Sequence, residues 1–266
     1  MPLQKEIWID SILNGLFAEN SFLNYSVDHS EFVSNHVVHV PNAGKESKVE
    51  MDRASRPATV SKRDDSELTY QLHEFTTDPV LIENAEEVEL SYNKRESVIS
   101  VDRAHLQEKV GEYILSQWMP TKDSQKLKVT GKVTAGNISA LQRAFNKAKI
   151  PQMERVILLG ADAYGDLLDN LTTSQASAFL ACADAQKGVV GNLYGFSFLD
   201  PRYALDGALG LAWHAKYVCR ALGEVKMFEE TDSPTYYGSM FSFLLRAGGA
   251  KMATDEKGVM SLVANA

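Results

Sequence analysis

The chain has 266 residues, which is enough for one large domain or two small ones. Hydrophobic residues make up 44% and charged residues 23%, values typical of a globular protein with a sizeable core, and they exclude a disordered or low-complexity chain. The net charge of −8 disfavours a dedicated phosphate-binding surface, so we expect any contact with nucleic acid to be weak.

The sequence lacks the features of membrane and secreted proteins. Its apolar runs stay well below the roughly 18 residues that a transmembrane helix needs. The first residues, Met1 to Glu6, lack the apolar core of a signal peptide. Cys182 and Cys219 are too few for a disulfide framework and lack the spacing of a metal or redox site. We therefore expect an intracellular protein in which both thiols are buried and inert.

In chain order, the first predicted element is a helix over Ile7 to Phe22, where apolar residues recur at helical spacing. Amphipathic membrane helices carry Lys and Arg on the polar face, and this stretch has neither. The pattern therefore indicates an arm that packs against protein.

A long two-stranded excursion with a polar tip is predicted next. Val37 to Val40 precede the tip, and Leu68, Tyr70 and Leu72 follow it in alternation with polar neighbours, as in a half-buried strand. A solvated hairpin is the simplest interpretation, but mixed charge also suits salt-bridged contact with a second copy of the chain. The tip holds eleven charged residues, six positive and five negative: Lys45, Glu46, Lys48, Glu50, Asp52, Arg53, Arg56, Lys62, Arg63, Asp64 and Asp65.

Two helices are predicted after this excursion. Between them and the hairpin, the acidic stretch from Glu83 to Glu89 has no ligand-like partner nearby and indicates a solvated face. Asp102 can cap a helix over Arg103 to Trp118, and Pro120 ends it. The second helix follows a turn-rich stretch at Gly131 to Gly136 and ends before Pro151. Its predicted capping box consists of Ser139 and Gln142.

The remainder of the chain predicts a compact lobe of alternating helices and strands, followed by terminal strands. Arg155 to Leu159 is a short apolar strand with a helix directly after it. The glycines at positions 188, 191 and 195 indicate hairpin turns. Two further strands are expected between Met240 and Val263.

Motifs for catalysis fail on physical grounds. Gly160 and Gly165 have the separation of a phosphate loop, but Asp166 replaces its lysine and Asp162 adds a second repelling charge. His36 and His39 would point to opposite faces of a strand, so they cannot share a metal there. His214 is best explained as a packed or capping histidine. We therefore assign no catalytic, cofactor-binding or metal-ligating residue.

The order of elements resembles that of the major capsid proteins of tailed bacteriophages, which have the Hong Kong 97-type fold. Four stretches carry the resemblance, and their order and spacing are more specific than any one of them. They are SALQRAFNKAKIPQMERVILLGADAYGDLL from Ser139, GVVGNLYGFSFLD from Gly188, AWHAKYVCRALG from Ala212 and GAKMATDEKGVMSLV near the end. In the family, the third stretch is a histidine-containing turn, a helix and an outgoing strand, and the fourth is a closing hairpin.

This resemblance implies an α+β fold with five parts. Residues 1–35 would be an N-terminal arm, and 36–99 an extended β-hairpin loop reaching across a neighbouring subunit. Residues 100–150 would be the peripheral domain with its spine helix, and 151–227 the axial domain. Residues 228–266 would return to the peripheral domain.

The resemblance further implies a coat protein that self-assembles as pentamers and hexamers into an icosahedral shell around double-stranded DNA. Implied partners are the portal protein, a separate scaffolding protein and packaged DNA in weak nonspecific contact, with no membrane and no cofactor. The protein would be made in the bacterial host cytoplasm and reside in the virion. Our candidates for inter-subunit contact are Arg53, Arg56, Arg63, Asp64 and Asp65.

Two alternatives stay open at this point. An encapsulin-type nanocompartment shell would have the same fold but enclose cargo protein. A small soluble α/β enzyme with an unrecognised site around Gly160 to Tyr194 would form a small oligomer and be stabilised by its ligand.

Overall fold

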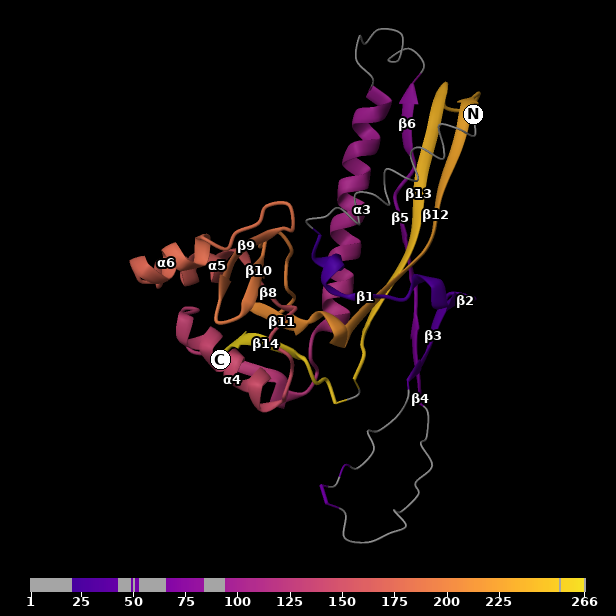
Figure 1. The fold of residues 1–266 in the computed structure, drawn as a ribbon. Coiled ribbons are helices and arrows are strands. Elements are labelled where there is room, and N and C mark those ends of the chain that lie inside the picture. The colour runs from indigo at the N-terminus through magenta and orange to yellow at the C-terminus, as the bar shows by residue number, and fades with distance from the viewer. Residues whose placement is uncertain are drawn as a thin grey trace.

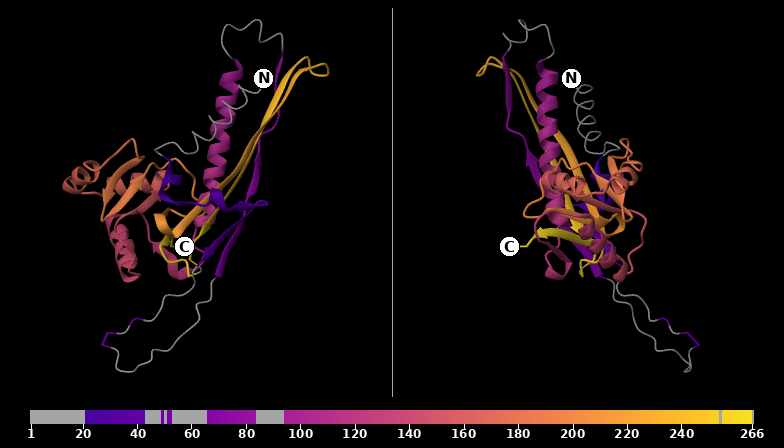
Figure 2. Two further views of the ribbon diagram at one scale, coloured as in Figure 1. Left: turned by 45° about the vertical axis from the view of Figure 1, so that its right-hand side comes forward. Right: turned by 90° about the vertical axis from the view of Figure 1, so that its left-hand side faces the viewer.

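A long helix and three β-sheets organise the chain in the computed structural model, which describes residues 21–42, 49, 51–52, 66–83, 94–253 and 255–265. Helix α3 (Lys94–Trp118) runs beside an elongated sheet, and a lobe of helices and strands projects from one end of this pair (Figures 1 and 2). The predicted α+β class is therefore confirmed.

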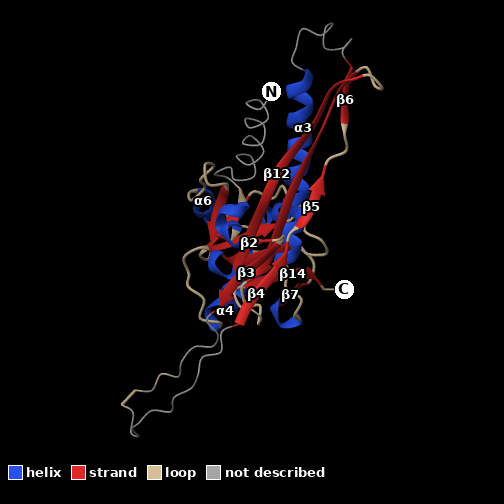
Figure 3. Ribbon diagram, turned by 90° about the vertical axis from the view of Figure 1, so that its right-hand side faces the viewer, coloured by secondary structure: helices blue, strands red, loops and turns tan. Residues whose placement is uncertain are grey.

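The elongated sheet is built on a long hairpin of β12 (Val218–Ser233) and β13 (Gly238–Lys251). β5 (His73–Thr76) and β6 (Val80–Glu83) add antiparallel to β13, and the short β1 (Val27–Asp28) adds parallel to β12. We call this sheet together with α3 the hairpin body. Buried residues along β12 and β13 pack with those of α3 in one core cluster, so the helix covers one face of the sheet (Figure 3).

The lobe contains a six-stranded sheet in the order β7-β14-β11-β8-β10-β9. A second apolar cluster, which includes residues of all three lobe helices, fills this part of the molecule. The strands are β7 (Lys126–Val129), β8 (Arg155–Leu159), β9 (Val189–Leu193), β10 (Phe196–Leu199), β11 (Gly210–His214) and β14 (Val259–Ala264); the helices are α4 (Ala135–Lys147), α5 (Ala161–Asp169) and α6 (Thr173–Leu180).

A small third sheet holds the base of the predicted excursion. β2 (Val33–Ser34), β3 (Val37–Asn42) and β4 (Ser66–Gln71) pair antiparallel, and their apolar side chains pack on Ala221 of β12. The two predicted strands are thus confirmed. Four single 3₁₀ turns complete the described elements: η1 (Phe22–Tyr25), η2 (Ser30–Phe32), η3 (Asp123–Gln125) and η4 (Ala215–Tyr217).

The elements meet at a cluster of aromatic side chains. Trp118 at the end of α3 is fully buried, with its ring centroid 5.6 Å from that of Phe22 and 5.5 Å from that of Trp213. The Trp118 Nε1–H donates to the carbonyl of Cys219 at 2.9 Å, and the Trp213 Nε1–H donates to that of Tyr25 at 2.8 Å. Because each buried indole satisfies its donor, the cluster joins α3, β11, β12 and the segment around η1.

Several predicted elements occur where the sequence placed them. The predicted helix over Arg103 to Trp118 lies within α3, which begins earlier, and the strand over Arg155 to Leu159 is β8. β9 and β10 form the expected hairpin. Its turn residues Tyr194 and Gly195 have φ of 50° and 78°, the left-handed backbone that a tight two-residue turn requires.

Other predictions about local structure are wrong. The helix cap lies five residues earlier than Ser139 and Gln142, because Thr134 is the N-cap of α4 and forms its capping box with Asn137. The Thr134 N–H and Oγ1–H both donate to Asn137 Oδ1, at 2.9 and 2.8 Å. Cys182 is exposed, since it follows the end of α6, whereas Cys219 is buried as predicted. Burial raises the pKa of the Cys219 thiol to about 11.

The resemblance also misplaced two elements near the C-terminus. No α-helix follows His214: after the single turn η4, the chain enters β12 directly at Val218 and pairs with β13. The last two strands do not form a hairpin either. β13 belongs to the elongated sheet and β14 to the lobe sheet, so the turn between them is a crossing from one body to the other.

Substitution of two glycines in the lobe by alanine should change the free energy of unfolding in opposite directions. A Cβ at Gly191 in β9 would lie 2.4 Å from ring atoms of the buried Phe179, whereas Gly165 in α5 has no atom within 4 Å of an added Cβ. Gly191→Ala should lower the free energy of unfolding by about 1–3 kcal/mol through overpacking. Gly165→Ala should raise it by roughly 1 kcal/mol through helix propensity. Urea denaturation of both variants measures the difference, and equal effects would contradict this packing.

Candidate assembly surfaces

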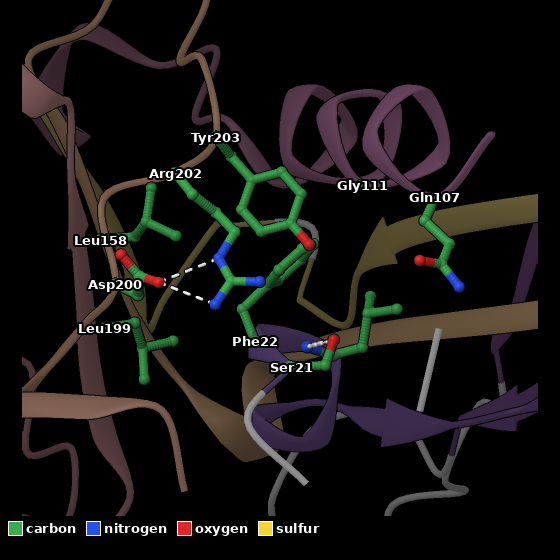
Figure 4. Close-up of a pocket in the computed structure, with 10 residues that line it drawn as sticks. Ser21, Phe22, Gln107, Gly111, Leu158, Leu199, Asp200, Arg202 and Tyr203 are labelled. Atoms are coloured by element: carbon green, nitrogen blue, oxygen red, sulfur yellow. Dashed lines mark hydrogen bonds and ion pairs between the residues drawn. The ribbon is translucent and has the colours of Figure 1, made fainter. Parts of the chain in front are cut away.

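The cavity between the N-terminal segment, α3 and the lobe is too small for a substrate. It measures about 60 Å³, far below the several hundred Å³ of typical ligand sites. Figure 4 shows the Tyr203 ring over Gly111 of α3 and close to Phe22, whose ring centroid is 4.8 Å away. Two charged side chains that line it, Asp200 and Arg202, form an ion pair at 2.7 Å. This cavity is a packing seam and not a binding pocket.

The stretch from Gly160 to Asp166 and His214, both considered above as possible catalytic motifs, have structural roles. Gly160 precedes α5 as its N-cap, and Asp166 pairs with Lys132 at 2.9 Å. His214 is buried, and its Nδ1 accepts the Lys216 N–H at 3.1 Å, so the predicted capping role is confirmed. Burial lowers the pKa of His214, which keeps the ring neutral.

His36 and His39 lie in different kinds of backbone, the first in a turn and the second in a strand. His36 has a φ of 66° in the turn between β2 and β3. His39 lies on β3, where its Nδ1 is 2.6 Å from the Glu67 carboxylate across the strand pair. Among the described residues, no group of three or more His, Cys, Asp or Glu side chains could hold a metal ion.

In the described part of the chain, no helix is long and apolar enough to cross a membrane.

Among the described residues, several exposed aromatic side chains gather at the distal end of the long hairpin. We call this surface the tip patch; it lines an open groove of about 610 Å³. Phe228 and Tyr236 are 52% and 53% exposed, and Tyr237 in the adjoining turn is 80% exposed. The groove is lined by Pro79, Leu81, Phe228, Glu229, Glu230, Tyr236, Met240, Phe241 and Ser242.

Strand register places Phe228 and Met240 of the tip patch on the side of the sheet that faces away from α3. Phe228 lies opposite Ser242, and Met240 lies opposite Leu81. Their neighbours on the other side, such as Phe243, are buried in the core shared with α3. Exposed aromatic side chains at this density are typical of protein–protein contacts, so the tip patch is a candidate interface.

The tip patch was missed in the sequence, although one signal was available. Along β12, Val225 and Met227 are buried while Glu224, Lys226 and Phe228 are exposed. Alternation thus assigns Phe228 to the same side as two charged residues, where an aromatic ring has no core to enter. An aromatic residue at a solvent position of a strand is the pattern that points to such a surface.

The candidate contact residues from the sequence lie outside the described residues. Arg53, Arg56, Arg63, Asp64 and Asp65 all belong to the stretch 53–65, which the structure does not describe. Their assignment to inter-subunit contacts stays a prediction. The described base of that excursion, β3 and β4, is joined by the exposed pair of His39 and Glu67.

Comparison with known proteins identifies the fold. No protein-family model matches the sequence, and no curated protein matches it either. Among solved structures, it is similar to one from Mycobacterium phage Che8, at 15% identity and a TM-score of 0.68, covering 91% of this chain and 90% of the other. The capsid structure of Cyanophage P-SCSP1u has 14% identity and a TM-score of 0.62, with coverage of 91% and 86%.

A third similar structure is the mature capsid of bacteriophage PhiM1, at 9% identity and a TM-score of 0.64. The alignment covers 92% of this chain and 87% of the other. At such low identities the likeness establishes the fold and leaves the activity to other arguments. The prediction of a phage capsid fold is confirmed, and the chain has the fold found in phage capsid structures.

Proposed function

We propose that this chain is the major capsid protein of a tailed bacteriophage, a structural protein that self-assembles into an icosahedral shell around double-stranded DNA. The observation that carries the proposal is the similarity to phage capsid structures along about nine-tenths of both chains. A likeness of this extent includes the elongated hairpin body as well as the lobe. An elongated, unevenly shaped subunit suits a shell better than it suits an isolated enzyme.

The proposed domains of the chain are those expected from the sequence. Residues 1–35 form the arm, 36–99 the extended loop, 100–150 the peripheral domain, 151–227 the axial domain and 228–266 the return. The lobe has its own sheet and core, which also include β7, α4 and β14 from outside residues 151–227. β12 runs uninterrupted through residues 227 and 228, so the axial and peripheral parts are joined by a continuous strand.

The proposed partners are other copies of the chain, arranged as pentamers and hexamers. The tip patch and the charged stretch 43–65 provide two chemically different surfaces for these contacts, one aromatic and one ionic. A portal protein and a separate scaffolding protein complete the particle. The net charge of −8 supports weak contact with packaged DNA. The protein acts in the virion after synthesis in the host cytoplasm.

Assembly itself tests the proposal. The full chain, expressed alone and together with the product of the neighbouring gene, is analysed by sedimentation velocity and negative-stain electron microscopy. Shells, or rings of five or six subunits, are expected in at least one preparation. Shells enclosing a protein cargo would favour a nanocompartment. A monomer or dimer in both preparations, especially one stabilised by a small ligand, would contradict a capsid role.

Phe228→Ser should impair assembly much more than it impairs folding. Because half of the Phe228 side chain is already exposed, its loss should change the free energy of unfolding by less than about 1 kcal/mol. Loss of an interface anchor costs about 2 kcal/mol or more per contact. Sedimentation velocity measures the assembled fraction, and urea denaturation measures stability.

The control for this experiment is Glu224→Gln, on the exposed side of the same strand but outside the groove. It should assemble as the parent does. Normal assembly of Phe228→Ser would remove the tip patch from the list of contacts without affecting the fold assignment.

Arg56→Glu tests the charged stretch in the same way. Reversing one charge in a salt-bridged interface opposes like charges and should slow or prevent assembly, particularly at low salt. The stability of the unassembled subunit should change little if this stretch contacts only other copies. Equal losses of assembly and stability would show that it is ordinary surface of the folded subunit.

A further inference from the structure

The junction between the hairpin body and the lobe is crossed by the chain three times between residues 94 and 265. The first crossing joins α3 to β7, the second joins β11 to β12, and the third joins β13 to β14. In Figure 2 the two bodies project in different directions from this junction. The two bodies also share one apolar core, in which Leu158 and Trp213 of the lobe cluster with Trp118 of α3. Their relative orientation therefore depends on this shared core and on how the three crossings are held to one another.

A buried carboxylate ties the first crossing to the third. Glu256, in the turn before β14, has a side chain only 6% exposed. Its oxygens accept the Thr121 N–H at 3.0 and 3.1 Å, the Thr121 hydroxyl at 2.6 Å and the Lys122 N–H at 2.9 Å. The Lys251 ammonium lies 3.1 Å from Glu256 Oε1 and also donates to the Met119 carbonyl at 2.6 Å.

The second crossing is fixed to the third by backbone and ring contacts. The Met252 N–H donates to the Tyr217 carbonyl at 2.9 Å, and the His214 N–H donates to the Gly258 carbonyl at 3.0 Å. Gly258 has a φ of 87° and lies so close to the Tyr217 ring that a Cβ there would be 2.3 Å away. None of these contacts involves Glu256 directly.

Glu256 combines two unfavourable features, a left-handed backbone conformation and a buried carboxylate, which its hydrogen bonds offset. Its backbone φ is 59°, a left-handed conformation that is unfavourable for a residue with a side chain. Burial alone would raise its pKa, but the hydrogen bonds from Thr121 and Lys122 and from Lys251 outweigh burial and hold the pKa at about 2. The carboxylate is therefore charged at neutral pH, and its stabilising effect is lost only as the pH falls towards 2.

We propose that Glu256 is a clasp that sets the orientation of the lobe relative to the hairpin body. It holds the end of α3 against the turn before β14, and that turn in turn holds the second crossing. Without the carboxylate, the shared core around Trp118 still holds the two bodies together, but the range of their relative orientations widens. In any assembly of this chain, the clasp would let the two bodies act as one rigid unit.

Distance measurement between the two bodies tests this proposal in the unassembled full-length subunit. Cys182 is exposed on the lobe and takes a spin label, while the buried Cys219 is shielded. Lys226→Cys adds a second label on the exposed side of the long hairpin. Pulsed electron spin resonance should give one narrow distance distribution in this background. Glu256→Ala should shift or broaden it, and Glu256→Gln should do so less, because the amide keeps one acceptor oxygen.

Two further variants separate a clasp from a general loss of stability. Glu154→Gln alters an exposed carboxylate near the same junction, 3.9 Å from Lys216, and should leave the distribution unchanged. Thr121→Val removes the shortest hydrogen bond to Glu256 with no change of charge and should broaden the distribution. Hydrogen exchange should stay slow in β8 in every variant, and quicken about tenfold at Met252 when Glu256 is replaced.

An unchanged distance distribution in Glu256→Gln and Thr121→Val would overturn the clasp. So would uniform loss of protection that includes β8, because it would show that Glu256 supports the whole fold and not the orientation. Neither result depends on assembly, so this test can fail while the proposed capsid function stands, and the reverse.

Discussion

The burial of Trp118 between α3 and the lobe is the contact on which the rest of the structure depends. Its indole touches Phe22 and Trp213, and its N–H satisfies a carbonyl of β12. Those partners belong to the N-terminal segment, the lobe and the long hairpin. A large apolar surface is thus removed from water where α3, the N-terminal segment, the lobe and the long hairpin meet. Elements that project far from this place need only local packing to hold their shape.

The long hairpin of β12 and β13 is covered differently near Trp118 and at its distal end. Near Trp118 it is covered by α3 on one side and by the small β2–β3–β4 sheet through Ala221. Towards its distal end, the described residues cover the α3 side, and Phe228 and Met240 lie on the opposite side and line an open groove. An apolar surface without an internal partner gains free energy by meeting an external one. In a shell, every copy of the chain would meet such a partner.

Charge is used differently in the core and on the surface. Glu256 is buried and accepts hydrogen bonds from Thr121 and Lys122, and the partly buried Lys251 ammonium pairs with it and donates to the Met119 carbonyl, which makes their geometry specific. Exposed pairs such as Lys226 with Glu224, and His39 with Glu67, contribute little to stability because water screens them.

The sequence by itself determined the local elements: the periodicity that predicts α3 and β8, the glycine turn of β9 and β10, and the charged interval between β3 and β4. It misplaced the cap of α4, because Thr134 and Asn137 form a capping box five residues earlier than Ser139 and Gln142. Only the tertiary structure decided that β13 and β14 enter different sheets and that Glu256 meets Thr121. These facts depend on residues far apart in the chain, and local patterns carry no information on which distant partner a strand or side chain will meet.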